Sequence, residues 1–308
     1  MKIHTFLIGL CLLASCSVAQ PIRVLTLDSS RSGVCGGIDY NILTGNAFAA
    51  VRGAMDDPGN FGGGGVVDRE IAWAAQVPVV TRDALQTCDV VLLSSNLTRL
   101  DVCERRALFE FVDAGGGVFM FSNGAISQMG LPLGATPAPV NGSGNGLITD
   151  ESSPVTDGPF GAVAGTLSMA FHRGFDAVGP NGSAFVASDI DYGATFEVGA
   201  GRAVLYGDEE SFMAISENGC AAGMLTNKEL AIFLNTVAFI APDPGFEFTG
   251  SGECCPADAN QDGEVNTIDV LAFLNQWNGD EAFADINGDG VINTQDVLAF
   301  LNLWNGGC

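Results

Sequence analysis

The feature of this sequence that most constrains its fold is a repeat near the C-terminal end. Residues 258–279 read DANQDGEVNTIDVLAFLNQWNG, and 27 positions later residues 285–306 read DINGDGVINTQDVLAFLNLWNG. Each copy joins a loop of the form D-x-N-x-D-G-x-[VI]-N-x-x-D to an apolar stretch. Two copies in register indicate two similar loop–helix units, because self-similarity at a fixed period marks a repeated structural unit.

The spacing within each loop is that of a metal-binding turn. Asp258, Asn260 and Asp262 alternate, so a tightly curled chain brings three side-chain oxygens to one point, and Gly263 allows the sharp turn, as in an EF-hand loop. The expected ligands of the first loop are Asp258, Asn260, Asp262, Glu264 through its carbonyl, Asn266 through a water, and Asp269. Those of the second are Asp285, Asn287, Asp289, Val291 through its carbonyl, Asn293 and Asp296. Such hard oxygen ligands favour Ca²⁺ over zinc or magnesium.

A single loop of this composition is also compatible with an ordinary turn, and it is the duplication that favours the metal-binding interpretation. Three carboxylates in one loop repel one another without an ion, so folding of this segment is predicted to depend on calcium.

An apolar stripe follows each loop at helical spacing. It comprises Val270, Leu271, Phe273, Leu274 and Trp277 in the first copy, and Val297, Leu298, Phe300, Leu301 and Trp304 in the second. Neither helix can bury its stripe alone, so the two are predicted to pack on each other with both Trp residues in the core. A disulfide from Cys254 or Cys255 to Cys308 is expected to close this short domain.

Residues 254–308 resemble the dockerin family in having duplicated loops that end in Asp rather than Glu, each followed by a helix, with no helix before the loop. The opening Cys-Pro-Ala-Asp and the closing Gly307-Cys308 resemble the GC-type dockerin-like domains of planctomycete exported proteins. The resemblance implies calcium binding and docking onto a cohesin-like receptor or another cell-surface component, often in polysaccharide-degrading systems. Cellulosomal dockerins commonly carry a Ser-Thr-type pair before the last Asp, whereas this chain has Thr267-Ile268 and Thr294-Gln295, which leaves the receptor's identity open.

Residues 1–19 are predicted to be a signal peptide, with an apolar run too short to span a bilayer and a small-x-small site at Ser17-Val18-Ala19. The alternative is a lipobox, Leu13-Ala14-Ser15-Cys16, which would make Cys16 a lipidated N-terminus. Either interpretation predicts a secreted, cell-surface or periplasmic protein without a transmembrane span. In an oxidising compartment Cys35 is expected to pair with Cys103 or Cys220, and Cys88 to stay unpaired.

The charge of the chain excludes two classes of partner. It carries 36 acidic residues against 12 Lys and Arg, a net charge of −24, which repels nucleic-acid phosphates and anionic lipid headgroups. The apolar fraction of 47% excludes a fully disordered chain.

The pattern of residues 21–241 predicts an α/β fold, a three-layer sandwich around a mainly parallel sheet. Residues 242–253 are predicted to be a linker. Expected strands lie at 23–27, 89–94, 117–121 and 202–206 and near Phe185 and Thr195, and expected helices at 40–54, 101–112 and 228–240. Ligands of such sheets gather at the carboxyl ends of the strands. The candidate positions there are 28–30, 94–96, 122–124 and 208–210.

The order of elements resembles the class I glutamine-amidotransferase-like fold, especially its trehalose-utilisation-like branch. The resemblance rests on RRALFEFVDAGGGVFMFSNG, SSPVTDGPFG and GRAVLYGDEESF. Active amidotransferases carry a Cys where this chain has Ser122, so that activity is disfavoured. Ser122, His172 and Glu209 or Asp208 are weak candidates for a hydrolytic triad, since Met120 stands where a nucleophile elbow has Gly. Otherwise, His172 is a structural residue and Ser122 begins an ordinary turn.

These observations predict an exported protein in which the dockerin-like module anchors an α/β domain of unassigned, non-catalytic activity. The alternative is a secreted hydrolase of polysaccharides or their substituents.

Overall fold

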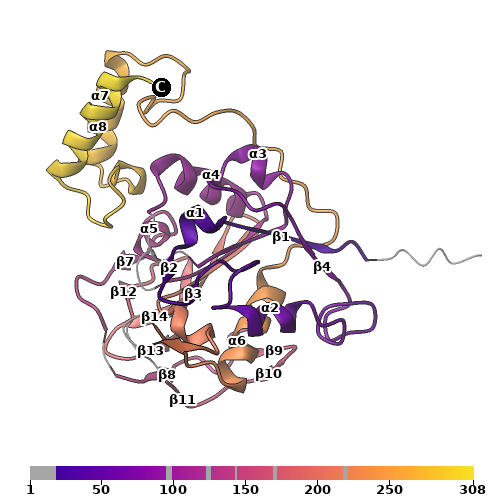
Figure 1. Ribbon diagram of the computed structural model, residues 1–308. Helices are drawn as coiled ribbons and strands as arrows, with labels where there is room; N and C mark the ends of the chain where they lie inside the picture. Colours follow the sequence, from indigo (N-terminus) through magenta and orange to yellow (C-terminus); the bar gives the residue numbers. More distant parts are fainter. Residues whose placement is uncertain (1–18, 95–98, 123–125, 143, 169–171, 218–220) are drawn as a thin grey trace, which may run out of the picture.

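The computed structural model describes residues 19–308 except 95–98, 123–125, 143, 169–171 and 218–220. All but the last residue of the predicted signal peptide, Cys16 included, therefore lies outside the described residues. The described chain forms an α/β body and a small helical unit at its C-terminal end (Figure 1).

The body is built on one large sheet with the order β11-β8-β13-β14-β15-β6-β5-β1-β4. The parallel half comprises β4 (Ile71–Trp73), β1 (Ile22–Thr26), β5 (Val90–Leu93), β6 (Gly117–Phe121) and β15 (Gly201–Tyr206). The antiparallel half comprises β14 (Asp191–Val198), β13 (Gly182–Ala187), β8 (Gly146–Ile148) and β11 (Thr166–Leu167), with β7 (Thr136–Pro137) and β12 (Phe175–Ala177) attached beside it.

Three short hairpins complete the strands. They are β2 (Val34–Cys35) with β3 (Ile38–Asp39), β9 (Asp157–Gly158) with β10 (Gly161–Ala162), and β16 (Ser216–Glu217) with β17 (Ala221–Ala222).

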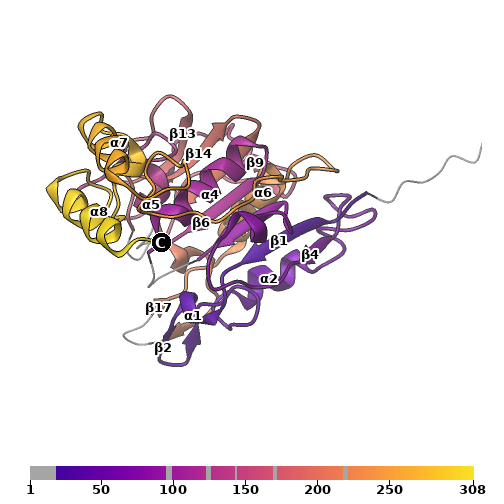
Figure 2. The same ribbon diagram turned by 90° about the horizontal axis from the view of Figure 1, so that it is seen from above.

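Helices cover both faces of the sheet, because the apolar strands send alternate side chains to opposite sides. In β6, Phe119 and Phe121 join the core under α2 (Ala49–Met55) and α6 (Asn227–Ile240). Val118 and Met120 join the core on the other face, where α3 (Arg82–Leu85), α4 (Val102–Asp113) and α5 (Ile126–Gly130) lie (Figures 1 and 2). Two short helical turns, α1 (Ser29–Ser32) and η1 (Glu209–Phe212), follow β1 and β15.

The predicted α/β class is confirmed, and the expected strands are present, including those near Phe185 and Thr195. The predicted helix at 40–54 is wrong over its first half, since α2 begins only at Ala49. Asn41 ends the extended chain there, because its side-chain oxygen accepts hydrogen bonds from the N–H groups of Leu43 and Thr44. Arg52 holds the resulting turn from α2 by donating to the carbonyls of Ile42 and Gly45.

The C-terminal unit consists of α7 (Thr267–Asn278), η2 (Ala282–Ala284) and α8 (Thr294–Gly306). Its core is small: Phe273 and Phe300 stack with ring centroids 4.1 Å apart and planes at 5°, next to Ala259 and Ala284. The predicted apolar stripes are only partly buried. Four of their members point outward, namely Leu271, Leu274, Leu298 and Leu301.

Residues 242–253 contain no helix or strand, but they do not run free of the body. Phe246 and Phe248 each pack edge-on against Phe111 of α4, with centroids 5.6 and 5.4 Å away. Arg69 donates hydrogen bonds to the carbonyls of Gln20, Pro21 and Pro242. The segment thus lies along the body before it reaches the C-terminal unit.

Two disulfides involve the C-terminal unit: one lies within it and the other joins it to the body. Cys255 pairs with Cys308, one of the two pairings expected for the end of the chain. The predicted Cys35–Cys103 bond is wrong, because Cys103 on the first turn of α4 pairs with Cys254. Cys35 is disulfide-bonded too, and Cys220, the other partner considered for it, lies outside the described residues. Cys88 is free, as predicted. It is also buried, and its burial raises the pKa of the thiol to about 12.

Candidate functional site

The first loop curls so that the carboxylates of Asp258 and Asp269 face the N–H groups of its backbone. The carboxylate of Asp258 accepts hydrogen bonds from the N–H groups of Asp262 (3.1 Å) and Gly263 (2.8 Å), with Gly263 at φ 89°. Asp269, in the first turn of α7, reaches back to the N–H groups of Asn260 (3.3 Å) and Asn266 (2.8 Å). These bonds hold carboxylates from both ends of the loop around one centre.

The second loop repeats this geometry bond for bond. Asp285 accepts from the N–H groups of Asp289 (3.1 Å) and Gly290 (3.0 Å), and Asp296 from those of Asn287 (3.2 Å) and Asn293 (2.8 Å). Asn266 and Asn293 also cap α7 and α8, since their side-chain oxygens accept hydrogen bonds from the N–H groups of Ile268 and Gln295. The expected curl of both loops is thus present, while the assignment of the ligands stays a prediction.

The two loops are connected crosswise by the tryptophans. Trp277, which follows the first loop, donates its indole N–H to the carbonyl of Asn293 in the second loop at 2.9 Å. Trp304, which follows the second, donates to the carbonyl of Asn266 in the first at 2.8 Å. Each loop is thus braced by the helix of the other repeat, which makes the pair one structural unit.

The donor set fits calcium. Asp269, Asp285 and Asp296 are fully buried and Asp258 nearly so. In the first loop, Asp258 and Asp269 accept hydrogen bonds from backbone N–H groups. Buried carboxylates without a cation are costly, and oxygen-only sites suit Ca²⁺. Over the part of the chain that the structure describes, no group of three or more His, Cys, Asp or Glu side chains is gathered as a metal cluster. The expected ligands here include amide and carbonyl oxygens besides the carboxylates.

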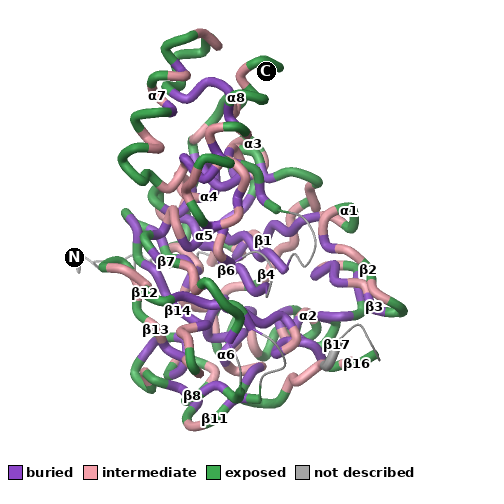
Figure 3. Tube along the Cα trace, turned by 90° about the vertical axis from the view of Figure 1, so that its left-hand side faces the viewer, coloured by how far each residue is buried: buried purple, intermediate pink, exposed green. Residues whose placement is uncertain are grey.

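Sequence reasoning missed an exposed apolar surface on the two helices. Leu271 and Leu298 are each 63% exposed and Leu274 and Leu301 each 38%, at equivalent positions of the repeat. Figure 3 shows that exposed residues recur along α7 and α8. We call these four residues the leucine face. The repeat explains why the exposed fractions are equal in the two copies. The spacing of the apolar stripe alone, however, does not indicate which of its residues face the partner helix.

Sequence reasoning also missed Arg105 of α4. Its guanidinium is fully buried beside the second loop, with Nη1 3.4 Å from the Asp285 carboxylate and Nη2 donating to the Asp285 carbonyl. Burial raises the pKa of Asp285, and Arg105 lowers it in part. Nothing in the sequence of α4 could indicate this contact, because it depends on where the C-terminal unit lies against the body.

The candidate residues at the carboxyl edge of the sheet differ in burial: Ser29 and Ser30 are exposed and Asp28 is half-buried, whereas Ser94, Ser122, Asp208 and Glu209 are buried. Ser122 follows β6 and its N–H bonds the carbonyl of Tyr206 on the neighbouring strand, at 2.9 Å. Asp208, after β15, caps η1 by accepting from the N–H of Glu210 and the hydroxyl of Ser211. Ser122, Asp208 and Glu209 are at most 1% exposed. Of the other candidates, residues 95–96 and 123–124 lie outside the described residues.

His172 uses its ring elsewhere. Its Nε2 lies 2.7 Å from the hydroxyl of Ser188 and 3.9 Å from the carboxylate of Asp189, and its ring packs on Tyr192 with centroids 4.7 Å apart. Nδ1 is buried with no hydrogen-bond partner among the described residues. Burial lowers the pKa of His172, with Asp189 opposing. The structure therefore records no hydrogen bond between His172 and Ser122, and the triad stays a prediction.

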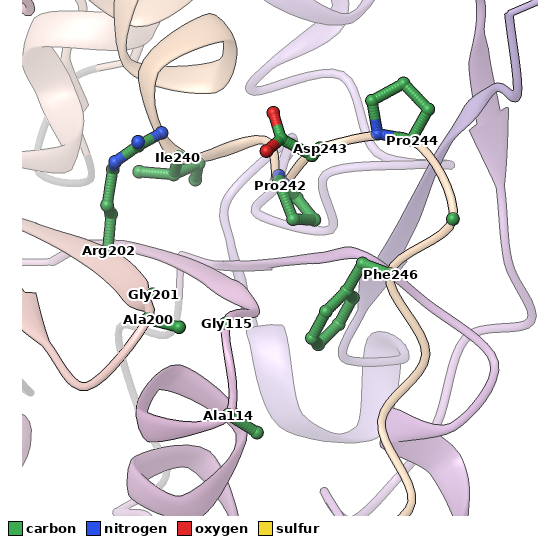
Figure 4. A pocket seen from close by; sticks show the side chains of 11 residues that line it. Ala114, Gly115, Ala200, Gly201, Arg202, Ile240, Pro242, Asp243, Pro244 and Phe246 are labelled. Atoms are coloured by element: carbon green, nitrogen blue, oxygen red, sulfur yellow. The ribbon is translucent and has the colours of Figure 1, made fainter.

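A hollow in the body lies at the opposite edge of the sheet. A pocket of about 340 Å³ opens where the chain enters β6 and β15, between Gly115, Gly201, Arg202 and the connecting residues Pro242 and Phe246 (Figure 4). Few polar side chains line it: Arg202 and Asp243 are the charged ones. It does not bring Ser122, Glu209 and His172 together.

The geometry of the C-terminal unit defines a class of protein module: two loops lined by oxygen atoms and braced by each other's helices, each loop leading into an α-helix. Residues 256–302 match the model of the dockerin type I domain. The expected dockerin-like unit is thus confirmed. Among the described residues no helix is both long and apolar enough to cross a membrane.

Solved structures similar to this chain include a cytoplasmic protein from Salmonella typhimurium, at 12% identity and a TM-score of 0.46, covering 72% of this chain and 100% of that one. Two others are described as putative ThuA-like proteins, the class that the sequence suggested. The one from Bacteroides uniformis has 11% identity and a TM-score of 0.43, covering 74% and 94%; the one from Parabacteroides merdae has 14% and 0.42, covering 76% and 94%. No curated protein matches. Because these TM-scores are below 0.5, the fold class rests on the strand order itself.

Proposed function

We propose that the C-terminal unit binds two calcium ions and attaches the α/β body to a cohesin-like receptor. The dockerin type I match supports the partner class, and the duplicated carboxylate loops support the ion. The leucine face supports the docking surface, because repeated exposed leucines on paired helices are the kind of apolar patch that interfaces cover. Calcium would order the loops that begin both helices and so set the spacing of this face.

Immobilised cohesin modules test this proposal. The wild-type chain is expected to bind at least one of them with calcium present and to lose binding in EGTA. The variant Leu271→Asp/Leu298→Asp should lose binding in calcium, whereas Leu147→Asp, which changes an exposed leucine of the body, should not. Binding that survives both EGTA and the double variant, or no binding to any cohesin, contradicts the proposal.

We further propose that the chain is exported after removal of residues 1–19, with lipidation of Cys16 as the alternative. Dockerin-containing proteins work outside the cell or at its surface, and the disulfides of both parts are those of an oxidising compartment. The mass of the mature N-terminus decides: a start at Gln20 supports the signal peptide, and a diacylglyceryl mass on Cys16 overturns it.

For the α/β body we propose a non-catalytic role as the cargo of the dockerin. The burial of Ser122 and Glu209 and the Ser188 bond of His172 support this role. Assays on a panel of glycans and esters, with Ser122→Ala and His172→Ala as controls, test it. Activity that either substitution abolishes would instead establish a hydrolase.

A further inference from the structure

The two calcium loops are equivalent in sequence but not in surroundings. The first is open to solvent at Asn260, Asp262 and Gly263. The second lies against the body, where Gly288 and Gly290 are buried and Asn287 and Asp289 are half-buried. The unit is seen beside α4 and α5 in Figure 2.

Several contacts hold the second loop against the body. The Cys103–Cys254 disulfide joins α4 to the start of the unit, and Phe283, just before the loop, packs edge-on against Phe109 with centroids 5.9 Å apart. The guanidinium of Arg106 lies 5.3 Å from the centre of the Phe283 ring. Arg99 donates to the carbonyl of Asn287 at 2.9 Å. The position of the loop is therefore fixed by both polar and apolar contacts.

Arg105 is the contact that changes the chemistry of the loop. Its guanidinium forms an ion pair with the carboxylate of Asp285, the first ligand position of the second loop, and both side chains are fully buried. The equivalent Asp258 receives the same two backbone hydrogen bonds, but no described side chain forms an ion pair with it. The charge of Arg106 acts on Asp258 from a greater distance, and Arg99 binds a carbonyl of the second loop. What distinguishes the second loop from the first is therefore the direct contact of Arg105 with a ligand carboxylate.

A permanent cation at this position acts on both states of the loop. Without calcium it offsets the repulsion among the carboxylates, so it stabilises the empty loop. When calcium binds, the guanidinium cannot lose its proton, so its charge opposes the ion. Affinity is the difference between the two states, so both effects lower it. A full charge a few ångström from a divalent ion changes affinity by about tenfold even at the dielectric constant of water.

We propose that Arg105 of the body makes the two calcium sites unequal: the second loop keeps its shape without calcium and binds it about tenfold or more weakly than the first. This inference rests on the proposed calcium binding. At intermediate calcium concentrations the first loop is loaded while the second stays held on the body by Arg105. The body thereby sets the calcium concentration at which the second loop is loaded.

Calorimetric titration of the calcium-free, disulfide-bonded full chain with calcium alone tests the proposal. The wild type should show two classes of site. Asp296→Ala should keep the tight class and Asp269→Ala the weak one, which assigns weak binding to the second loop. Arg105→Gln should tighten the weak site by about tenfold or more. Arg202→Gln, which removes the same charge from an exposed position where the side chain binds Phe239, should leave both sites unchanged.

The outcomes separate the two proposals. Two equal sites, a weak site assigned to the first loop, or no change in Arg105→Gln overturns the role of Arg105 and leaves calcium binding standing. Absence of any calcium binding overturns both. If Arg105→Gln does not fold, the order of affinities in the two single-loop variants still decides, because it needs no change at Arg105.

Discussion

Replacing Phe273 by Ala should destabilise the C-terminal unit while leaving the body folded. Phe273 is buried and stacked on Phe300, and these two rings with Ala259 and Ala284 are the fully buried part of the unit's core. Loss of a buried Phe costs about 3–5 kcal/mol, and loss of an aromatic pair adds about 0.5–1.5 kcal/mol. A core this small supplies only about 3–5 kcal/mol in total, so the loss removes most of the stability of the unit.

Urea unfolding followed by tryptophan fluorescence measures the effect. Trp277 and Trp304 belong to the unit and Trp73 to the body, so a Trp73→Phe background isolates the signal. Leu271→Ala, two residues away on the exposed side of α7, is the matched control and should change stability by less than about 0.5 kcal/mol. Calcium at a hundredfold excess over its Kd should restore about 2.7 kcal/mol per loaded site.

A loss below about 1 kcal/mol for Phe273→Ala, or one no larger than that of Leu271→Ala, would refute the assignment of the core.

Three further predictions concern single groups. The thiol of Cys88, with a pKa of about 12, should resist iodoacetamide at pH 8 in the native mature chain and react in urea. Folding raises this pKa from 9.0, so the contribution of the neutral thiol to stability is present below pH 9 and falls as the pH rises toward 12. Trp277→Phe should weaken calcium binding at the second loop and Trp304→Phe at the first, because each loses the hydrogen bond to the opposite loop, as titrations in the single-loop variants can show. Phe248→Ala should destabilise the body by about 3–5 kcal/mol in a thermal melt, because this ring is part of the core around Phe111; no change in the melt would mean that the connecting segment does not pack there.

Local patterns predicted much of this structure. The spacing of Asp, Asn and Gly in the repeat dictates the curl of both loops, because each bond within them joins residues close in sequence. The apolar runs that became β1, β5 and β6 are strands buried on both faces, which need no alternation to be recognised. The predicted helix at 40–54 was wrong over its first half because the side chain of Asn41 takes a backbone N–H hydrogen bond that a helix would use, and so forms a turn.

Features that depend on long-range placement were not predictable. The Cys103–Cys254 bond and the Arg105–Asp285 pair join residues 151 and 180 positions apart, across a contact between two units whose relative position no local pattern encodes. The exposure of Leu271 and Leu298 depends on the rotation of the paired helices, which the stacking of Phe273 on Phe300 sets.

The most direct test of the account is the number of calcium ions that the full chain holds. Native mass spectrometry of the disulfide-bonded protein in excess calcium should show two bound ions per chain, with one ion each for Asp269→Ala and Asp296→Ala. A chain that carries no calcium, or whose two ions persist in both variants, would contradict the claim that the paired loops are calcium sites.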